Sequence, residues 1–170
     1  QPWGGDVVYL AASDFTTPLT LFALDLNVME LTVMRRQPQQ FDSDGINVQQ
    51  FWTTSADGER IPYFHVGKNA TPDTPTLVYA YGGFGIPELP HYLGSVGKYW
   101  LEEGNAFVLA NIRGGGEFGP RWHQAAQGIS KHKSVDDLLA VVRDLSERGI
   151  SSPKHIGLQG GSNGGLITAA

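Results

Sequence analysis

Short apolar runs separated by polar, turn-forming residues fill the first part of the chain. Three of them, Val7–Leu10, Thr20–Leu24 and Leu31–Met34, have the length of β-strands, and Asp25-Leu26-Asn27 supplies turn residues between the last two. Each run is too short to bury much apolar surface by itself. We therefore expect these strands to belong to a larger sheet.

A polar segment and then a hairpin follow. Residues 36–45 (RQPQQFDSDG) contain a proline and few apolar side chains, which is typical of a linker. Val48–Thr54 and Arg60–Val66 then flank Ser55-Ala56-Asp57-Gly58, and Asp-Gly is a strong turn signal. The pattern predicts a β-hairpin over residues 48–66.

From Leu77 onward the pattern alternates between strands and helices. Apolar runs at Leu77–Tyr81, Phe107–Asn111 and Ile156–Gln159 predict buried strands, and helices are expected over Ser95–Glu103 and Val135–Arg148. This alternation is typical of a parallel sheet with crossover helices, so the fold class is α/β.

The second helix carries the clearer signals. Ser134 and Asp137 have the spacing of a capping box, and Gly149 stands where a helix commonly ends. The apolar stripe expected to face the sheet consists of Val135, Leu138, Leu139, Val142 and Leu145.

Composition and charge exclude several classes of function. The 170 residues carry a net charge of −5 without a block of Lys or Arg, which argues against nucleic-acid or anionic-membrane partners. No apolar stretch approaches the roughly 20 residues of a membrane-spanning helix. The absence of cysteine rules out disulfides, thiolate metal sites and a cysteine nucleophile. No metal-ligand cluster is visible, so we expect neither a metal nor an organic cofactor.

The run Gly160-Gly161-Ser162-Asn163-Gly164-Gly165 contains the pattern Gly-x-Ser-x-Gly of a nucleophile elbow. In such an elbow the serine occupies a strained turn between a buried strand and a helix, and small flanking residues let the backbone close. The predicted strand before the run and the helix-forming residues Leu166–Ala170 after it provide that context. Ser162 is therefore predicted to be a catalytic nucleophile.

A second glycine motif points to a different chemistry. Gly114-x-Gly116-x-x-Gly119 has the spacing of a dinucleotide fingerprint and follows a predicted strand. The segment after it is only weakly amphipathic and stops at Gly128, so no βαβ unit forms around the motif. We expect Arg113 and Glu117 to brace this loop, with Trp122 and His123 serving in packing and hydrogen bonding.

Three runs together extend the resemblance beyond a generic elbow. They are Tyr81-Gly82-Gly83-Phe84, the segment 111–119 (NIRGGGEFG) followed by Trp122-His123, and Gly160–Gly165. In this order and spacing the chain resembles the prolyl oligopeptidase family of serine peptidases. The resemblance implies the first half of an α/β-hydrolase sheet, preceded by strands from the end of a β-propeller. On that basis residues 1–40 would end the propeller and its linker, and residues 41–170 would begin the peptidase domain.

The resemblance also implies roles for particular residues. Ser162 would be the nucleophile, and the Tyr81 hydroxyl and the Asn163 backbone N–H would form the oxyanion hole. Phe84 would line the proline-binding pocket, which Asn163 borders. The substrates implied are short proline-containing peptides cut after proline, by a cytoplasmic enzyme or, as the alternative, a periplasmic one.

The other members of a catalytic triad are not expected in this chain. An α/β-hydrolase triad continues from Ser to Asp or Glu and then to His, but only eight residues follow Ser162. The chain starts at Gln1 and stops inside a predicted helix, so we expect it to be a window on a longer protein and to be inactive alone. The alternatives are a related serine hydrolase (oligopeptidase B-like, acylaminoacyl-peptidase or esterase) and a non-catalytic, peptide-binding relative.

Overall fold

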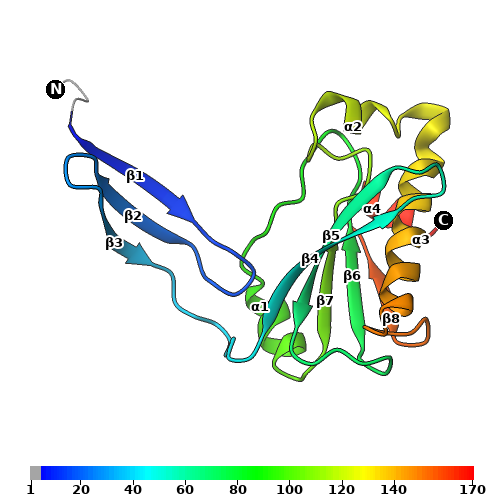
Figure 1. Cartoon of the computed structure of the whole chain (residues 1–170), viewed down its shortest axis with the longest axis horizontal. Coiled ribbons are helices and arrows are strands. Elements are labelled where there is room, and N and C mark those ends of the chain that lie inside the picture. Colours follow the sequence, from blue (N-terminus) through cyan, green and yellow to red (C-terminus); the bar gives the residue numbers. More distant parts are fainter. Residues whose placement is uncertain (1–4) are drawn as a thin grey trace.

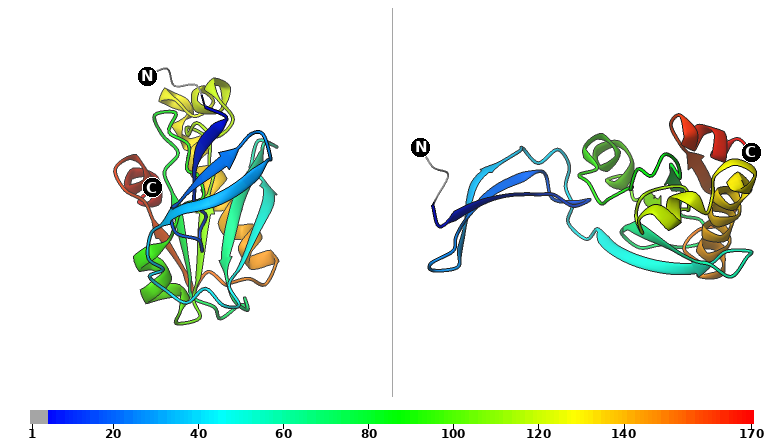
Figure 2. Two further views of the ribbon diagram at one scale, coloured as in Figure 1. Left: turned by 90° about the vertical axis from the view of Figure 1, so that its left-hand side faces the viewer. Right: turned by 90° about the horizontal axis from the view of Figure 1, so that it is seen from above.

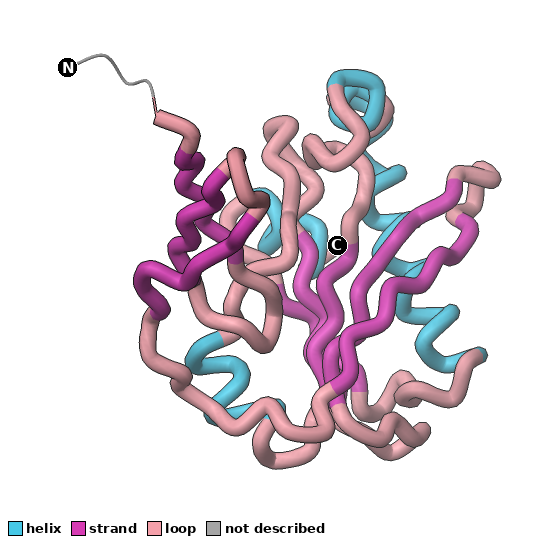
Figure 3. Tube along the Cα trace, turned by 60° about the vertical axis from the view of Figure 1, so that its left-hand side comes forward, coloured by secondary structure: helices cyan, strands magenta, loops and turns pink. Residues whose placement is uncertain are grey.

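The computed structural model describes residues 5–170, which form two separate sheets (Figure 1). A three-stranded antiparallel sheet contains β1 (Val7–Ala12), β2 (Thr20–Asp25) and β3 (Glu30–Arg36). An irregular segment links it to a five-stranded sheet (Figure 3). All three strands were predicted, and each extends one or two residues beyond one or both of its expected ends.

The five-stranded sheet has the order β4-β5-β7-β6-β8. Its strands are β4 (Asn47–Thr54), β5 (Arg60–Gly67), β6 (Thr76–Ala80), β7 (Ala106–Ala110) and β8 (Ile156–Gln159). The predicted hairpin is confirmed, and its second strand pairs antiparallel with β7, whereas β7, β6 and β8 are parallel. The predicted α/β architecture is therefore present.

Helical segments connect and cover the strands. They are α1 (Gly94–Val96), which continues into a π-helical turn η1 (Gly97–Leu101), α2 (Pro120–Gln124), a 3₁₀ turn η2 (Gly128–Lys131), α3 (His132–Glu147) and α4 (Asn163–Thr168). Among the described residues, none of these helices is long and apolar enough to cross a membrane.

Two apolar clusters pack on opposite faces of the five-stranded sheet. One joins Val78 and Val108 of the central strands to Leu138, Val141 and Leu145 of α3. The other contains Val66, Phe107 and Leu109 of the strands. Against them pack Leu93, just before α1, Leu101 at the end of η1, and the rings of Phe15 and Phe41. Figure 2 shows α1 and α3 on opposite sides of the strands. Every residue of β7 is buried, as expected for a central strand covered on both faces.

The three-stranded sheet has almost no core of its own. Every residue of β1 and β3 is exposed. Phe15, between β1 and β2, contacts the other sheet, and its ring centroid lies 5.5 Å from that of Phe64. In the linker after β3, Phe41 stacks on Tyr92 with ring centroids 5.3 Å apart. The assignment of residues 1–40 to the end of a propeller stays a prediction.

The structure corrects two expectations for α3. The helix begins at His132, three residues earlier than predicted, so Ser134 is not its N-cap; its hydroxyl donates to the Arg113 carbonyl at 2.7 Å. Leu139, predicted to face the sheet, is 51% exposed, whereas Asp137 is fully buried. Asp137 is buried because its carboxylate forms an ion pair with Arg113. The side of α3 that packs on the sheet therefore includes a charged residue. The predicted end at Gly149 is confirmed, with φ of 68°.

Candidate active site

The residues predicted to carry the chemistry follow parallel strands at one edge of the sheet. Tyr81 comes directly after β6, and the turn holding Ser162 comes after β8, which pairs with β6 in parallel register. The carboxyl ends of parallel strands are the usual place for ligand sites in open α/β sheets. Sequence positions 81 and 160–163 are therefore brought to the same edge.

Ser162 has a strained backbone. Its φ is 50° and its ψ is −115°, a combination that side-chain-bearing residues rarely adopt. The turn stays closed through a hydrogen bond from the Gly164 N–H to the Gly161 carbonyl at 2.8 Å, and α4 starts immediately afterwards at Asn163. Ser162 is exposed. A strand, a tight turn and a helix follow one another here, which is the geometry that a nucleophile elbow requires.

Glycines let this turn approach the sheet closely. A Cβ at Gly160 would overlap the backbone of Gly164, and a Cβ at Gly164 would overlap the Ala80 carbonyl at the end of β6. By contrast, in the described part of the chain nothing beyond the adjacent residues lies within 4 Å of the Cβ position at Gly161. Two of the glycines are thus fixed by backbone contacts, and one is not.

We expect Gly164→Ala to lower the free energy of unfolding by about 1–3 kcal/mol, because the added methyl overlaps backbone that cannot move aside. Gly161→Ala is the matched control and should change it by less than about 0.5 kcal/mol, since its Cβ points into open space. Urea unfolding of both variants measures the difference. Equal losses in the two variants would contradict the account of the elbow given above.

Asn163 ties the elbow to the segment that follows β6. Its side-chain amide donates to the Tyr81 carbonyl at 2.6 Å, and it occupies the space that a side chain at Gly83 would fill. Phe84 has φ of 57° and is 74% exposed. Phe84 and Asn163 line the same open cavity of about 320 Å³, together with Leu166 of α4. The structure thus brings Tyr81, Phe84, Ser162 and Asn163 into one region.

The triple-glycine loop serves chain packing. A Cβ at Gly114 would overlap the Gly82 carbonyl, and one at Gly116 would overlap the Gly85 carbonyl. The Gly85 N–H also donates to the Gly114 carbonyl at 3.1 Å. These glycines therefore allow two loops to lie backbone to backbone, which accounts for two of the three glycines of the fingerprint-like motif without a nucleotide.

The bracing role predicted for Arg113 is confirmed, but its partners were not foreseen. The buried guanidinium contacts Asp137 at 2.6 Å and Asp57 of the hairpin turn at 2.7 Å. Hydrogen bonding to these carboxylates raises the pKa of Arg113, and the pKa of Asp57 lies well below its usual range, chiefly because of Arg113. The sequence signal for this ion pair is Asp137 itself, a charged residue next to Leu138 and close to the apolar positions of α3.

The other bracing and packing expectations also hold. The Glu117 carboxylate accepts hydrogen bonds from the Glu88 N–H at 3.0 Å and from the Asn111 amide at 3.3 Å. Trp122 is buried and its indole donates to the Ile112 carbonyl, while His123 Nδ1 lies 2.8 Å from the Gly114 carbonyl. Each therefore supports the glycine loop.

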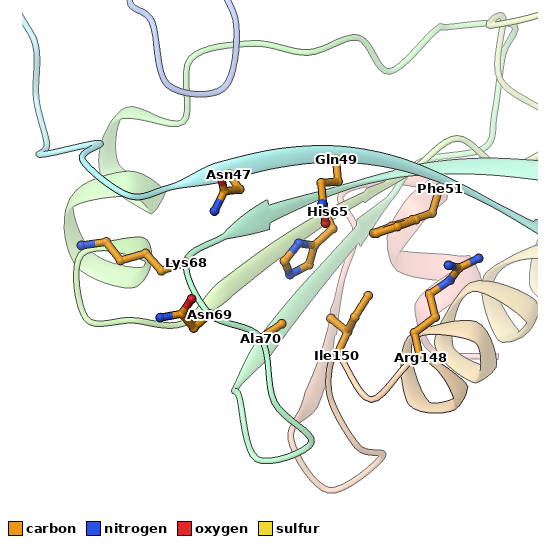
Figure 4. Close-up of a pocket in the computed structure, with 9 residues that line it drawn as sticks. All are labelled: Asn47, Gln49, Phe51, His65, Lys68, Asn69, Ala70, Arg148 and Ile150. Atoms are coloured by element: carbon orange, nitrogen blue, oxygen red, sulfur yellow. The ribbon is translucent and has the colours of Figure 1, made fainter.

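Two other histidines lie away from the elbow. His155 precedes β8, at the opposite end of that strand from Ser162. His65 is in β5, three strands from β8 in the sheet order, beside a hollow of about 500 Å³ that also exposes Lys68 and Arg148 (Figure 4). Burial lowers the pKa of His65, and its Nε2 is buried without a hydrogen-bond partner among residues 5–170. None of the predicted site residues lines this hollow.

Comparison with known proteins identifies the family. The sequence model of the prolyl oligopeptidase family matches residues 93–170. The chain is 44% identical over 165 residues to an uncharacterized peptidase, y4nA, of Sinorhizobium fredii, covering 95% of this chain and 23% of that protein. It is 32% identical over 166 residues to a prolyl endopeptidase of Elizabethkingia meningoseptica, covering 96% and 23%.

Solved structures agree with the sequence matches. A post-proline cleaving enzyme from Rickettsia typhi superposes with a TM-score of 0.86 at 38% identity, covering 96% of this chain and 24% of that one. The chain thus spans about a quarter of the length of the relatives it matches. It belongs to the prolyl oligopeptidase family of serine peptidases, and its five-stranded sheet is part of an α/β-hydrolase domain.

Proposed function

We propose that this chain is the part of a post-proline serine peptidase that carries the nucleophile and the oxyanion hole. The observation that carries the proposal is the backbone of Ser162, held at φ of 50° in a glycine-rich turn between β8 and α4. Strain of this kind persists where the surrounding structure enforces it, and it projects the hydroxyl above the sheet edge.

In the proposed reaction the Ser162 hydroxyl attacks the carbonyl carbon of a proline residue. A histidine base takes the hydroxyl proton, and the carbonyl oxygen becomes an oxyanion that accepts hydrogen bonds from the Tyr81 hydroxyl and the Asn163 backbone N–H. Collapse of this intermediate breaks the peptide bond, the leaving amine takes the proton, and water then hydrolyses the acyl-enzyme. Phe84 would offer an apolar ring to the proline side chain.

The base and its carboxylate would come from residues outside this chain. The proposal assigns residues 1–40 to the end of a propeller and its linker, and residues 41–170 to the first half of the peptidase domain. Support comes from the exposed strands β1 and β3, which bury no face of their own, and from relatives about four times as long. Substrates would be short proline-containing peptides, in the cytoplasm or periplasm, and the isolated 170 residues would be inactive.

The test uses the full-length protein that carries these residues. The protein is treated with a fluorophosphonate probe, and the labelled residue is mapped. In a second measurement, hydrolysis of matched chromogenic peptides with proline, arginine or alanine before the scissile bond is compared with hydrolysis of a simple ester. We expect labelling at Ser162 and the highest kcat/KM for the proline peptide. A preference for arginine or for the ester would indicate the related hydrolases instead, and no labelling would indicate a non-catalytic relative. Stoichiometric labelling of residues 1–170 alone would contradict the proposed division of the triad.

A further inference from the structure

The loop after β6 has an unusual concentration of left-handed backbone. Gly82, Phe84 and Gly85 have φ of 56°, 57° and 65°. Phe84 adopts this conformation at a steric cost because it has a side chain, so the loop keeps its shape only where other groups hold it. The loop also begins at Tyr81, whose hydroxyl the proposed function places in the oxyanion hole.

Three contacts from distant parts of the chain hold the loop. The Asn163 amide holds the Tyr81 carbonyl, and the Gly114 carbonyl accepts the Gly85 N–H. The third contact comes from Lys131, the last residue of η2, whose ammonium donates to the Gly82 carbonyl at 2.6 Å. Successive carbonyls at 81 and 82 are therefore each fixed by a side chain.

Lys131 is placed for this contact and not for a surface ion pair. It is half-buried, its partner is a neutral carbonyl, and burial lowers its pKa. Its Nζ also lies 3.3 Å from the Cβ position of Gly114, so it sits where the two glycine loops meet. A charged donor on a carbonyl makes a stronger hydrogen bond than a neutral pair does, and its short distance fits that class.

We propose that Lys131 is a positioning residue, which fixes the Tyr81–Gly85 loop through the Gly82 carbonyl and thereby orients the Tyr81 hydroxyl toward the oxyanion. This inference rests on the proposed function. Because oxyanion stabilisation acts on the transition state, loss of the contact should lower kcat and leave KM nearly unchanged. A misplacement on the scale of 1 Å can cost up to about 100-fold in rate.

The test compares Lys131→Met, Lys131→Arg and Lys131→Gln in the full-length protein with Lys133→Met. Lys133 lies two residues further along the same helical region and pairs with Asp57 at the surface, so it controls for loss of a lysine there. We expect Lys131→Met to lower kcat by about 10- to 100-fold at constant KM, and Lys131→Arg to restore part of the rate. Lys131→Gln keeps a neutral hydrogen-bond donor at this position. It replaces Lys131→Met in the comparison if the methionine variant does not fold.

A double-mutant cycle with Tyr81→Phe separates positioning from general destabilisation. If Lys131 acts through Tyr81, the effect of Lys131→Met should largely disappear in the Tyr81→Phe background. Hydrogen exchange should also quicken at the Gly85 and Ile86 amides, which donate to the Gly114 and Gly83 carbonyls, in Lys131→Met while β6 stays protected.

The outcomes distinguish this inference from the proposed function. Three results would overturn the positioning role while Ser162 remains labelled by the fluorophosphonate. They are multiplicative effects in the double-mutant cycle, a change confined to KM, and unchanged hydrogen exchange in the loop. A KM change alone would mean that Lys131 contacts substrate through the cavity it shares with Phe84 and Asn163. Absence of labelling at Ser162 in the unmodified protein would overturn the proposed function, and the positioning role of Lys131 with it.

Discussion

Replacing Ser162 with alanine in the full-length protein is expected to reduce kcat for a proline peptide by a factor on the order of a million. The physical reason is that every chemical step of the proposed reaction passes through the Ser162 hydroxyl, and losing the nucleophile of such a unit costs about as much as losing the whole unit. Steady-state hydrolysis and fluorophosphonate labelling measure the loss. Ser95→Ala, at an exposed position in α1, is the control and should retain full activity.

Glycine at the same position separates chemistry from strain. Ser162→Gly should be as inactive as Ser162→Ala, but it should be more stable to urea than the alanine variant by about 1 kcal/mol, because glycine adopts φ of 50° without a steric penalty. Residual activity above one tenth in either variant would remove Ser162 from the nucleophile role. Equal stabilities of the glycine and alanine variants would show that the turn is not strained.

The location of the candidate site follows from local patterns in the sequence. Apolar runs predicted β6 and β8, and a parallel sheet brings the carboxyl ends of those strands to one edge, which is where Tyr81 and Ser162 lie. The positive φ at Gly58 and Gly149 likewise follows from glycine's freedom from a Cβ clash. Such features depend on a few neighbouring residues and on sheet geometry alone.

What the sequence did not reveal depends on contacts between distant segments. The buried face of α3 was misjudged at Leu139 because the phase of that helix is set by Asp137, whose partner Arg113 lies 24 residues earlier. Lys131 was overlooked for the same reason, since its partner Gly82 is 49 residues away. A periodicity argument treats charged side chains as exposed, and both exceptions are charged groups satisfied by partners that only the fold brings near.

The Arg113–Asp137 pair gives the second large effect. We expect Asp137→Asn to lower the free energy of unfolding by about 3–5 kcal/mol, because it leaves the guanidinium of Arg113, only 3% exposed, without its buried counter-charge. The same carboxylate accepts the Arg113 backbone N–H at 2.9 Å and the Ser55 hydroxyl at 2.6 Å, and an amide, with one acceptor oxygen and an NH2 group in place of the other, cannot satisfy all these buried donors. Urea unfolding of the full-length protein measures the change.

Asp57→Asn is the matched control, since Asp57 contacts the same guanidinium from the surface. Its side chain is 38% exposed, so solvent screens the interaction and the expected loss is at most about 1 kcal/mol. A cost for Asp137→Asn no greater than that for Asp57→Asn would contradict the assignment of Arg113 and Asp137 as a desolvated pair. Because Arg113 directly precedes the glycine loop that accepts the Gly85 N–H, the Asp137 variant should also lose activity under conditions where it is still folded. In the same conditions the Asp57 variant should stay close to the unmodified protein, which would link the buried charge to the geometry at Tyr81.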